Sequence, residues 1–328
     1  MPELVSVNAE APCAPFLHEI KPMTEEQYAE LLKRIGATKA SLERDVQLLR
    51  EWLGQQPHLP QLGAEWDPWL TRFLVGSKNS LQRAKETLEK YCTSRAQYPD
   101  MFKQQPSPVV EQLFQLIKSG VLPIVTPQGT RMVMTRFSKE LGEDSSKMDW
   151  GVYFRLTCHM VELFLASENH PVDAEICVDL EHYSVTLSNS FVANLSLFKQ
   201  LVEVTQGSVP LHYKAVHLLN APAIIKTVIA MVRPFLKDKL GERIIVHENY
   251  ESFEKCVHKA CLPSDYGGQS GKTLAQMCDD WHLIIHTNMP WFNARQQRLA
   301  ADESKRVGGR TRQDDFGVEG SFRKLAVD

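Results

Sequence analysis

The chain has 328 residues, enough for one large domain and a smaller one. Its 43% hydrophobic and 23% charged residues are typical of a globular protein, and its net charge of -3 excludes a generally basic nucleic-acid-binding protein. No run of about 18 apolar residues suggests a membrane span, and no apolar segment near the start suggests a secretory signal. Seven scattered cysteines then favour free thiols and a cytoplasmic location.

The first part of the chain is predicted to be helical. We expect residues 1–22 to be disordered and residues 23–122 to form a helical domain. A helical pattern runs from Thr24, which caps its first turn, to about Leu53, because apolar residues recur there at helical spacing. Further helices begin at Asp67 and Ser80, and helical segments are expected to continue to about residue 118.

After Pro123 strands and helices alternate. Such alternation implies right-handed crossovers onto a mainly parallel sheet, here an α/β domain over 123–292. The segment 221–236 is apolar on almost every side, so as a helix it must cover an apolar surface. A charged, flexible tail is expected over 293–328. Strands are predicted at 131–137, 174–180, 215–219 and 244–246, and other helices at 149–167, 187–205 and 274–286.

Patterns that suggest an enzyme or a metal site are incomplete. The segment 267–273 is similar to a phosphate-binding loop, but Tyr266 stands where a glycine is required. His282 and His286 have zinc-compatible spacing, but the residues between them include no general base. We therefore predict no catalytic residue, cofactor or metal. A nucleotide-dependent enzyme acting through Gly271-Lys-Thr remains a third hypothesis.

Four short segments occur together in the order found in one known family. They are Asn220-Ala-Pro, Arg233-Pro-Phe-Leu, Glu242-Arg-Ile and Leu262-Pro-Ser-Asp-Tyr-Gly-Gly, in which Asp265 replaces the more usual Glu. On these segments the chain resembles the CRAL-TRIO lipid-binding family, in the tocopherol-transfer and retinaldehyde-binding branch and its invertebrate members. The resemblance runs from about residue 67 to 292. It implies an α/β lipid-binding bowl, a mainly parallel sheet with flanking helices and a mobile gate helix, after an all-helical N-terminal domain.

The resemblance also implies an internal pocket for a small hydrophobic lipid. Apolar residues at these spacings are also what a plain core requires, so for each residue core packing is the alternative. Thr157 and Thr205 would bind one polar group of the lipid, because buried hydroxyls need partners. The expected pocket residues are Phe154, Thr157, Val161, Phe164, Ile176, Val178, Leu201, Val204, Thr205, Val209, Leu211, Val216 and Leu218, and those of the gate helix are Ile224, Ile225, Val228, Ile229 and Val232.

Basic residues near the gate form the second expected site. In this branch such residues bind phosphoinositide head groups, phosphatidylinositol bisphosphate in particular. Val75, His212 and Gly241 depart from the family pattern, and each departure removes positive charge, so we expect weaker binding. Solvated surface charge is the alternative. The expected residues are His212, Lys214, Arg233, Lys237, Lys239 and Arg243.

Leu211 narrows the expected ligand. The branch that exchanges phosphatidylinositol has a Glu at this position, and Leu cannot bind an inositol head group. The sequence thus predicts a monomeric, non-enzymatic carrier of a retinoid, tocopherol, terpenoid or sterol-like lipid. We expect it to bind membranes transiently and to have no nucleic-acid partner. The alternative is a non-transporting regulator in which the bound lipid controls contact with a protein partner.

Overall fold

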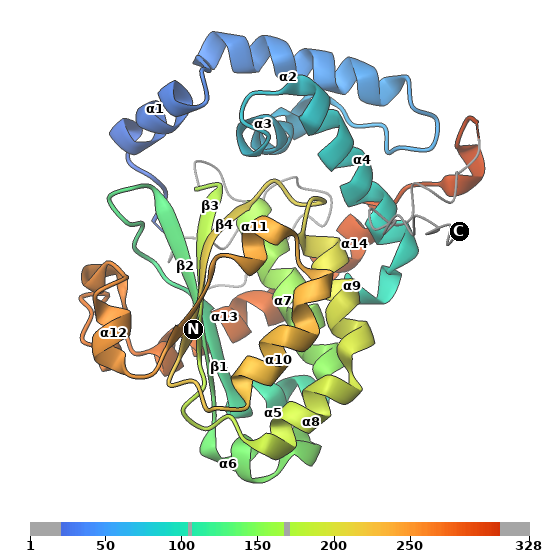
Figure 1. Cartoon of the computed structure of the whole chain (residues 1–328). Helices are drawn as coiled ribbons and strands as arrows, with labels where there is room; N and C mark the ends of the chain where they lie inside the picture. The colour runs from blue at the N-terminus through green and yellow to red at the C-terminus, as the bar shows by residue number, and fades with distance from the viewer. Residues whose placement is uncertain (1–20, 104–106, 167–170, 309–328) are drawn as a thin grey trace, which may run out of the picture.

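The structure is a computed structural model that describes residues 21–103, 107–166 and 171–308. Almost all of the segment predicted to be disordered, 1–22, lies outside these residues. Figure 1 shows the first helices across one end of the molecule, above a five-stranded sheet. They are α1 (Glu25–Arg34), α2 (Lys39–Gly54), α3 (Asp67–Gly76) and α4 (Leu81–Gln97).

These helices begin at the polar residues that cap them. Thr24 and Thr38 each form a capping box, and the Ser80 side chain accepts a hydrogen bond from the backbone N–H of Arg83. The sequence predicted a helical pattern from Thr24 to about residue 53, and the structure divides this segment into two helices. Two helices form because Gly36 adopts a left-handed backbone (φ 65°) and Thr38 then caps the second helix.

The α/β part begins earlier than predicted. Helix α5 (Pro108–Leu116) packs into the core of the α/β part, and strand β1 (Ile117–Val121) follows directly. The prediction of helix to about residue 118 was therefore wrong at its end. Strand β1 forms because it pairs antiparallel with β2 (Thr130–Phe137), a tertiary contact that local propensity does not indicate.

The other strands confirm the mainly parallel sheet. The order is β1-β2-β3-β4-β5, and β2 to β5 are parallel to one another. The remaining strands are β3 (Asp173–Asp179), β4 (His212–Leu219) and β5 (Ile244–His247).

Helices from the crossovers cover one face of this sheet. In Figure 1, α8, α9 and α10 lie to the right of the sheet and α12 to its left. The predicted helix 187–205 is divided at Asn194, and the predicted helix 221–236 is an α-helix only over 225–232, followed by a 3₁₀ turn that contains Pro234. The helices here are α6 (Lys139–Glu143), α7 (Trp150–Leu165), α8 (Val185–Ala193), α9 (Leu195–Thr205), α10 (Ile225–Val232), α11 (Asp238–Gly241) and α12 (Tyr250–Glu254).

The C-terminal helices join the two parts of the molecule. Helix α13 (Leu274–Thr287) packs on β1, and α14 (Met289–Leu299) follows it. A flexible tail was expected from residue 293, but Arg295 and Leu299 are buried, and Arg295 contacts Glu162 of α7 at 3.2 Å. The regular structure therefore extends past the expected boundary, because α14 fills the junction between α4 and α7.

Candidate functional site

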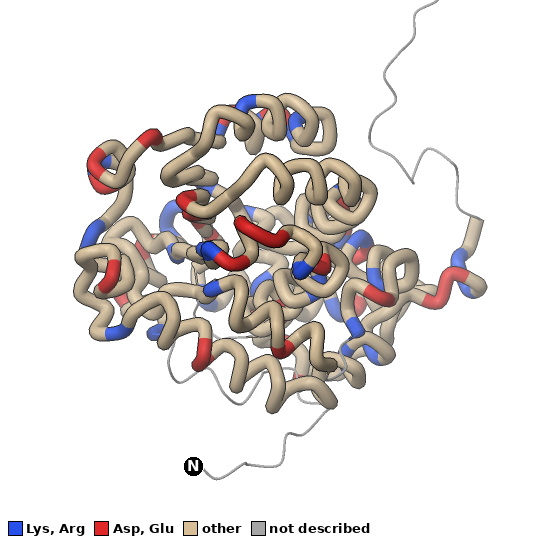
Figure 2. The backbone as a smooth tube through the Cα atoms, turned by 90° about the horizontal axis from the view of Figure 1, so that it is seen from below, with Lys and Arg blue, Asp and Glu red and all other residues tan. Residues whose placement is uncertain are grey.

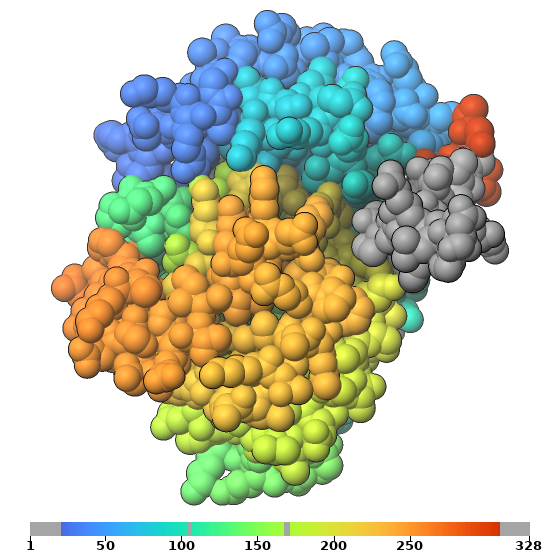
Figure 3. All heavy atoms as spheres, in the orientation of Figure 1, coloured from blue at the N-terminus to red at the C-terminus, as the bar shows by residue number. Residues whose placement is uncertain are grey.

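An apolar cavity of about 310 Å³ lies between the sheet and the helices α7 to α10. Such a volume is in the range of small-molecule sites. Figure 3 shows the α10 segment covering this side of the molecule. The walls are formed by Phe137, Trp150, Tyr153, Phe154, Thr157, Ile176, Val178, Leu180, Tyr183, Phe191, Phe198, Leu201, Val202, Thr205, Gln206, Tyr213, Val216, Leu218, Ile225, Val228, Ile229, Val232, Leu236, Leu240 and Ile244.

Strand alternation places the apolar floor of this cavity. Ile176 and Val178 of β3 are paired with Val216 and Leu218 of β4, so the four side chains form one patch on a single face. The intervening Cys177 points to the opposite face, where it packs in a separate core cluster. The alternation of side chains along the strands therefore decides which residues face the helices.

Twelve of the predicted pocket and gate residues line the cavity, and six do not. Val161 lies one turn beyond Thr157 on α7, where it packs against the core of the helical domain, and the guanidinium of Arg72 lies 5.8 Å from the ring of Phe164. The cavity ends there because α3 and α4 cover that end of α7. Outside the walls are Val161, Phe164, Val204, Val209, Leu211 and Ile224, while Val209 and Leu211 line a second site instead.

Sequence reasoning missed most of the aromatic wall. Trp150 begins α7, and its ring lies 5.6 Å from that of Phe154 and 5.0 Å from that of Phe191 on α8. Phe198 of α9 closes this cluster at 5.3 Å from Phe191. The spacing of Trp150, Phe154 and Thr157 on one helical face was the available signal.

The two threonine hydroxyls of the cavity already donate hydrogen bonds. Thr157 Oγ1 donates to the carbonyl oxygen of Tyr153 at 3.1 Å, and Thr205 Oγ1 donates to that of Leu201 at 2.7 Å. Each hydroxyl retains lone pairs that accept hydrogen bonds. The cavity therefore offers a ligand mainly apolar contacts and a few acceptors.

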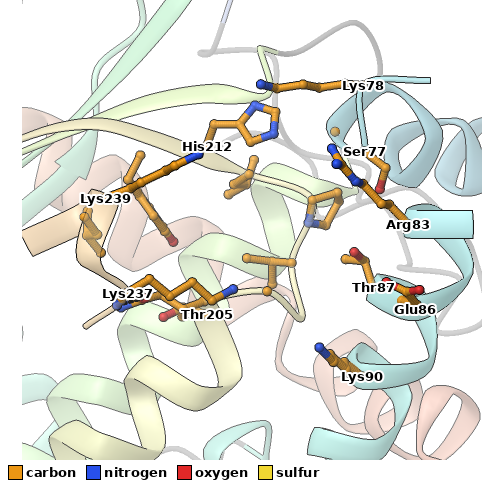
Figure 4. Close-up of a pocket in the computed structure, with 18 of the residues that line it drawn as sticks. Ser77, Lys78, Arg83, Glu86, Thr87, Lys90, Thr205, His212, Lys237 and Lys239 are labelled. Atoms are coloured by element: carbon orange, nitrogen blue, oxygen red, sulfur yellow. Dashed lines mark hydrogen bonds between the residues drawn. The ribbon is translucent and has the colours of Figure 1, made fainter. Parts of the chain in front are cut away.

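A second site is a cleft of about 420 Å³ between the helical domain and the α/β part. We call it the basic cleft. One wall comes from the end of α3 and from α4, and the other from the segment after α9, from β4 and from the α11 region. Figure 4 shows Arg83 and Lys90 on one side of the cleft and Lys237 and Lys239 on the other. The cationic side chains that line it are Lys78, Arg83, Lys90, Lys237, Lys239 and Arg243, with His212 beside them.

Four of the six predicted basic residues line this cleft: His212, Lys237, Lys239 and Arg243. Lys214 lies outside it, and its Nζ contacts Oδ2 of the buried Asp173 at 3.3 Å. Arg233 packs beside Gly241, outside the walls.

Asp173 neutralises the charge on this side of the cleft. Oδ1 of Asp173 lies 3.0 Å from Nδ1 of His212, and Oδ2 lies 2.7 Å from Nη2 of Arg34 on α1. Burial opposes ionisation of Asp173, but the hydrogen bond with His212 and the charges of Lys214 and Arg34 lower the pKa of its carboxyl group. Lys214 is thereby held in a structural ion pair.

Lysine and arginine residues of the helical domain were missed at this site. Lys78, Arg83 and Lys90 come from the helical domain, where the sequence analysis considered only Val75 in relation to binding. Arg83 and Lys90 are seven residues apart, so they share one face of α4. That spacing was visible in the sequence, but which surface the face would meet depends on the packing of the two domains.

The basic cleft has an excess of positive charge. Both signs are scattered along the chain in Figure 2, as a net charge of -3 implies, so this excess is local. Glu86 is the acidic residue of the cleft walls, and among the described residues none of the six lysine and arginine side chains forms an ion pair. Burial, and then repulsion from Lys90, lower the pKa of Lys237. Such an arrangement favours binding of an anion.

The basic cleft and the apolar cavity share a wall. Thr205, Gln206, Tyr213 and Leu240 line both. Gln206 also joins the two sides of this wall, because its Oε1 accepts a hydrogen bond from the backbone N–H of Lys237 at 3.0 Å. Only the thickness of a single side chain therefore separates a ligand in the apolar cavity from a ligand in the basic cleft.

Residues of the two enzyme-like sequence patterns make contacts within the protein, as Lys272 and His282 show. Nζ of Lys272 contacts Oδ2 of Asp280 at 2.7 Å, and the carboxylate of Asp265 accepts a hydrogen bond from the N–H of Leu274. The start of α13 is thus capped within the chain. His282 stacks on Phe114, with ring centroids 4.2 Å apart. Within residues 21–103, 107–166 and 171–308, no cluster of three His, Cys, Asp or Glu is placed to bind a metal, and no helix is long and apolar enough to span a membrane.

Models of two known domain families match different parts of the chain. Residues 118–268 match the model of the CRAL/TRIO domain, and residues 38–106 match that of the Pinta-like UBA domain. The alpha-tocopherol transfer protein-like protein of Homo sapiens is 29% identical over 235 residues, 70% of this chain and 66% of that protein, just under two thirds of its length. Clavesin-1 of Xenopus laevis is 26% identical over 232 residues, 70% of this chain and 68% of that protein. The crystal structure of Sfh5 aligns with a TM-score of 0.48 at 12% identity, over 78% of this chain and 92% of that one.

Proposed function

We propose that the chain is a member of the CRAL-TRIO family, in its tocopherol-transfer-protein-like branch, and that it carries a small hydrophobic lipid and exchanges it at membranes. The observation that carries this proposal is the apolar cavity behind α10. The proposed role is binding alone, because the walls of the cavity are mainly apolar side chains. The carrier would act in the cytoplasm and, transiently, at membrane surfaces.

The free energy of binding would come from apolar burial. A lipid that buries about 400 Å² of apolar surface gains about 10 kcal/mol before the costs of ordering are subtracted. Thr157 or Thr205 would accept a hydrogen bond from a ligand hydroxyl, because the hydroxyl of each already donates within its own helix. Leu211 offers no hydrogen bond to a charged head group. These features favour a retinoid, tocopherol, terpenoid or sterol-like lipid.

Helix α10 is the proposed gate. Ile225 and Val232 are buried and line the cavity, whereas Met231 on the outer face is 41% exposed. Pro222 precedes the helix and Pro234 follows it, so regular backbone hydrogen bonding is interrupted at both ends. Movement of this helix as a unit would open the cavity at a membrane surface.

The basic cleft is the proposed site for a phosphoinositide head group on the membrane. Lys237, Lys239 and Arg243 lie close to the gate and have no ion-pair partner among the described residues. Lys and Arg bind phosphate as point charges and as bidentate donors respectively. Binding there would hold the protein on a membrane that displays phosphoinositides while the lipid is exchanged.

The decisive experiment is native mass spectrometry of the freshly purified protein, followed by organic extraction and a transfer assay between vesicles. A stoichiometric hydrophobic molecule that moves between vesicles supports a carrier. A tightly retained lipid with no transfer would instead support a lipid-responsive regulator with a protein partner. An empty protein that takes up nothing from a mixed lipid extract contradicts the proposal.

A further inference from the structure

The proposed gate is held to the rest of the protein differently at its two ends. Before α10, Nδ2 of Asn220 donates to Oδ1 of the buried Asp179 at 2.9 Å, and the N–H of Ala221 donates to the carbonyl oxygen of His247 at 3.3 Å. Asn220 has a left-handed backbone (φ 52°), which turns the chain out of β4 toward the gate. This end is therefore anchored to the last residues of β3 and β5.

The other end of the gate depends on one side chain. Among the described residues, the segment 222–236 forms hydrogen bonds only within itself. Directly after it, the backbone N–H of Lys237 donates to Oε1 of Gln206, the C-cap residue of α9, at 3.0 Å. Val232 is the last buried side chain of the gate, and residues 233–234 are exposed. The bond to Gln206 is therefore the main polar contact that holds this end in place.

Gln206 also lines the apolar cavity, beside Thr205. In Figure 4 Lys237 lies next to this end of α9, where Thr205 is labelled. Nε2 of Gln206 has no hydrogen-bond partner among the described residues, so its N–H groups are available to a ligand. Because the amide group is planar, the contact of its oxygen with Lys237 also fixes the direction of its nitrogen. One side chain therefore connects the end of the gate with the contents of the cavity.

We infer that Gln206 is the latch of the gate: its Oε1 holds the end at Lys237 closed, while its Nε2 donates a hydrogen bond to an oxygen atom of the bound lipid. This inference rests on the proposed gated cavity, and it assigns the hinge to residues 220–222 and the moving end to residues 233–237. A lipid with an acceptor oxygen at this end of the cavity fixes the amide in the orientation that holds Lys237. Such a lipid slows its own release, whereas a hydrocarbon does not.

Two substitutions of Gln206 separate its two hydrogen bonds. Gln206→Met has a similar length and makes neither bond, whereas Gln206→Glu still accepts from the N–H of Lys237 but, when ionised, cannot donate to a lipid. The matched control is Gln47→Met, which removes an exposed side-chain hydrogen bond to Glu51 of 3.1 Å in the helical domain. The probes are retinyl methyl ether, which has an acceptor oxygen, and the hydrocarbon axerophthene, which has the same ring and polyene chain. The rate of their transfer from the protein to phosphatidylcholine vesicles is measured by fluorescence.

Gln206→Met should release axerophthene about two- to tenfold faster than the wild type, which is the range for the loss of one hydrogen bond. It should release the ether faster still, because it loses the contact with the lipid as well. Gln206→Glu should hold axerophthene longer than Gln206→Met does, but it should no longer favour the ether over the hydrocarbon. The control should release both lipids as the wild type does. Wild-type release of axerophthene by Gln206→Met, or a wild-type preference for the ether in Gln206→Glu, would overturn the inference.

Amide hydrogen exchange at Lys237, followed by NMR, tests the latch without any lipid. Its amide should exchange about two- to tenfold faster in Gln206→Met than in the wild type and should stay protected in Gln206→Glu. The amide of Ala221 should exchange equally in all variants, because its partner at His247 is unchanged. Equal exchange at Lys237 in all variants would overturn the inference. If neither lipid binds to any variant, the proposed lipid carriage is contradicted, while exchange at Lys237 still decides the latch.

Discussion

Lys90 of α4 and Lys237 of the α11 region lie on opposite walls of the basic cleft, and Lys90 contributes to lowering the pKa of Lys237. Burial in the cleft is the larger cause and repulsion between the two charges the smaller. An anion between the walls would oppose both effects, because it attracts the two positive charges and favours the charged form of Lys237. This attraction is the physical basis of the phosphoinositide site proposed above.

Filling the cavity should abolish lipid carriage without unfolding the protein. Val216→Trp places a large side chain on the apolar floor, and we expect bound lipid and vesicle transfer to fall at least about tenfold. Leu283→Trp is the control, because Leu283 is 55% exposed on α13, outside the cavity walls. Transfer assays with a fluorescent lipid measure the effect, and normal transfer by Val216→Trp would contradict the cavity assignment.

Glu162 should be essential for stability. Its Oε2 lies 2.5 Å from Nη2 of Arg95 and 3.2 Å from Nε of Arg295, and both arginines are almost fully buried. Glu162→Gln leaves two buried guanidinium groups without a counter-charge, and breaking such a buried pair costs about 3–5 kcal/mol. Urea unfolding measures the loss. Lys139→Ala, which removes an exposed ion pair with Glu143, should change the midpoint little.

Helix α14 should be required for the stability of the whole fold. Trp291 and Leu299 are fully buried, and the guanidinium of Arg295 lies 4.8 Å from the ring of Trp291. Trp291→Ala is expected to cost about 3–5 kcal/mol through the cavity it leaves. A chain ended after Asn288 should unfold at a much lower temperature than one ended after Gly308. Equal unfolding temperatures would mean that α14 is dispensable.

Acidification should destabilise the protein through His159. Its ring packs 4.2 Å from that of Phe292 and its Nε2 lies 3.3 Å from the carbonyl oxygen of Phe102, and burial lowers its pKa from 6.5 to about 4. Between these values the unfolded chain gains a proton that the folded protein does not, so stability falls as pH falls, by about 3 kcal/mol in all. His159→Phe should reduce this slope, as urea unfolding at several pH values would show. An unchanged slope would contradict the role of His159.

The sequence predicted most elements of the α/β part because their patterns are local. Apolar strands and capped helices are determined by residues a few positions apart, and this includes Ile176 and Val178 on the cavity floor. The same reasoning missed the break at Gly36 and the pairing of β1. The local sequence gives little indication of either feature. A glycine inside a helical pattern can adopt a left-handed backbone, and β1 is a strand only because it pairs with β2.

Helical period shows which residues share a face, but not how far along that face a cavity extends. Thr157 and Val161 share one face of α7, yet Thr157 lines the cavity and Val161 packs against the helical domain. Val161→Arg would therefore disrupt the junction between the two domains and would not block the cavity. The position of α3 and α4 on α7 determines this, and it depends on contacts distant in sequence.

The sequence by itself determined the alternation of strands and helices after Pro123, the apolar segment 221–236 and four of the basic residues of the cleft, because each is a pattern of neighbouring residues. Only the tertiary structure decided that Arg83 and Lys90 face Lys237, that Lys214 is held by Asp173, and that Arg295 closes the junction with Glu162. Each of these contacts joins segments that lie tens to hundreds of residues apart. Their geometry depends on how the domains pack, and the periodicity of neighbouring residues does not predict that packing.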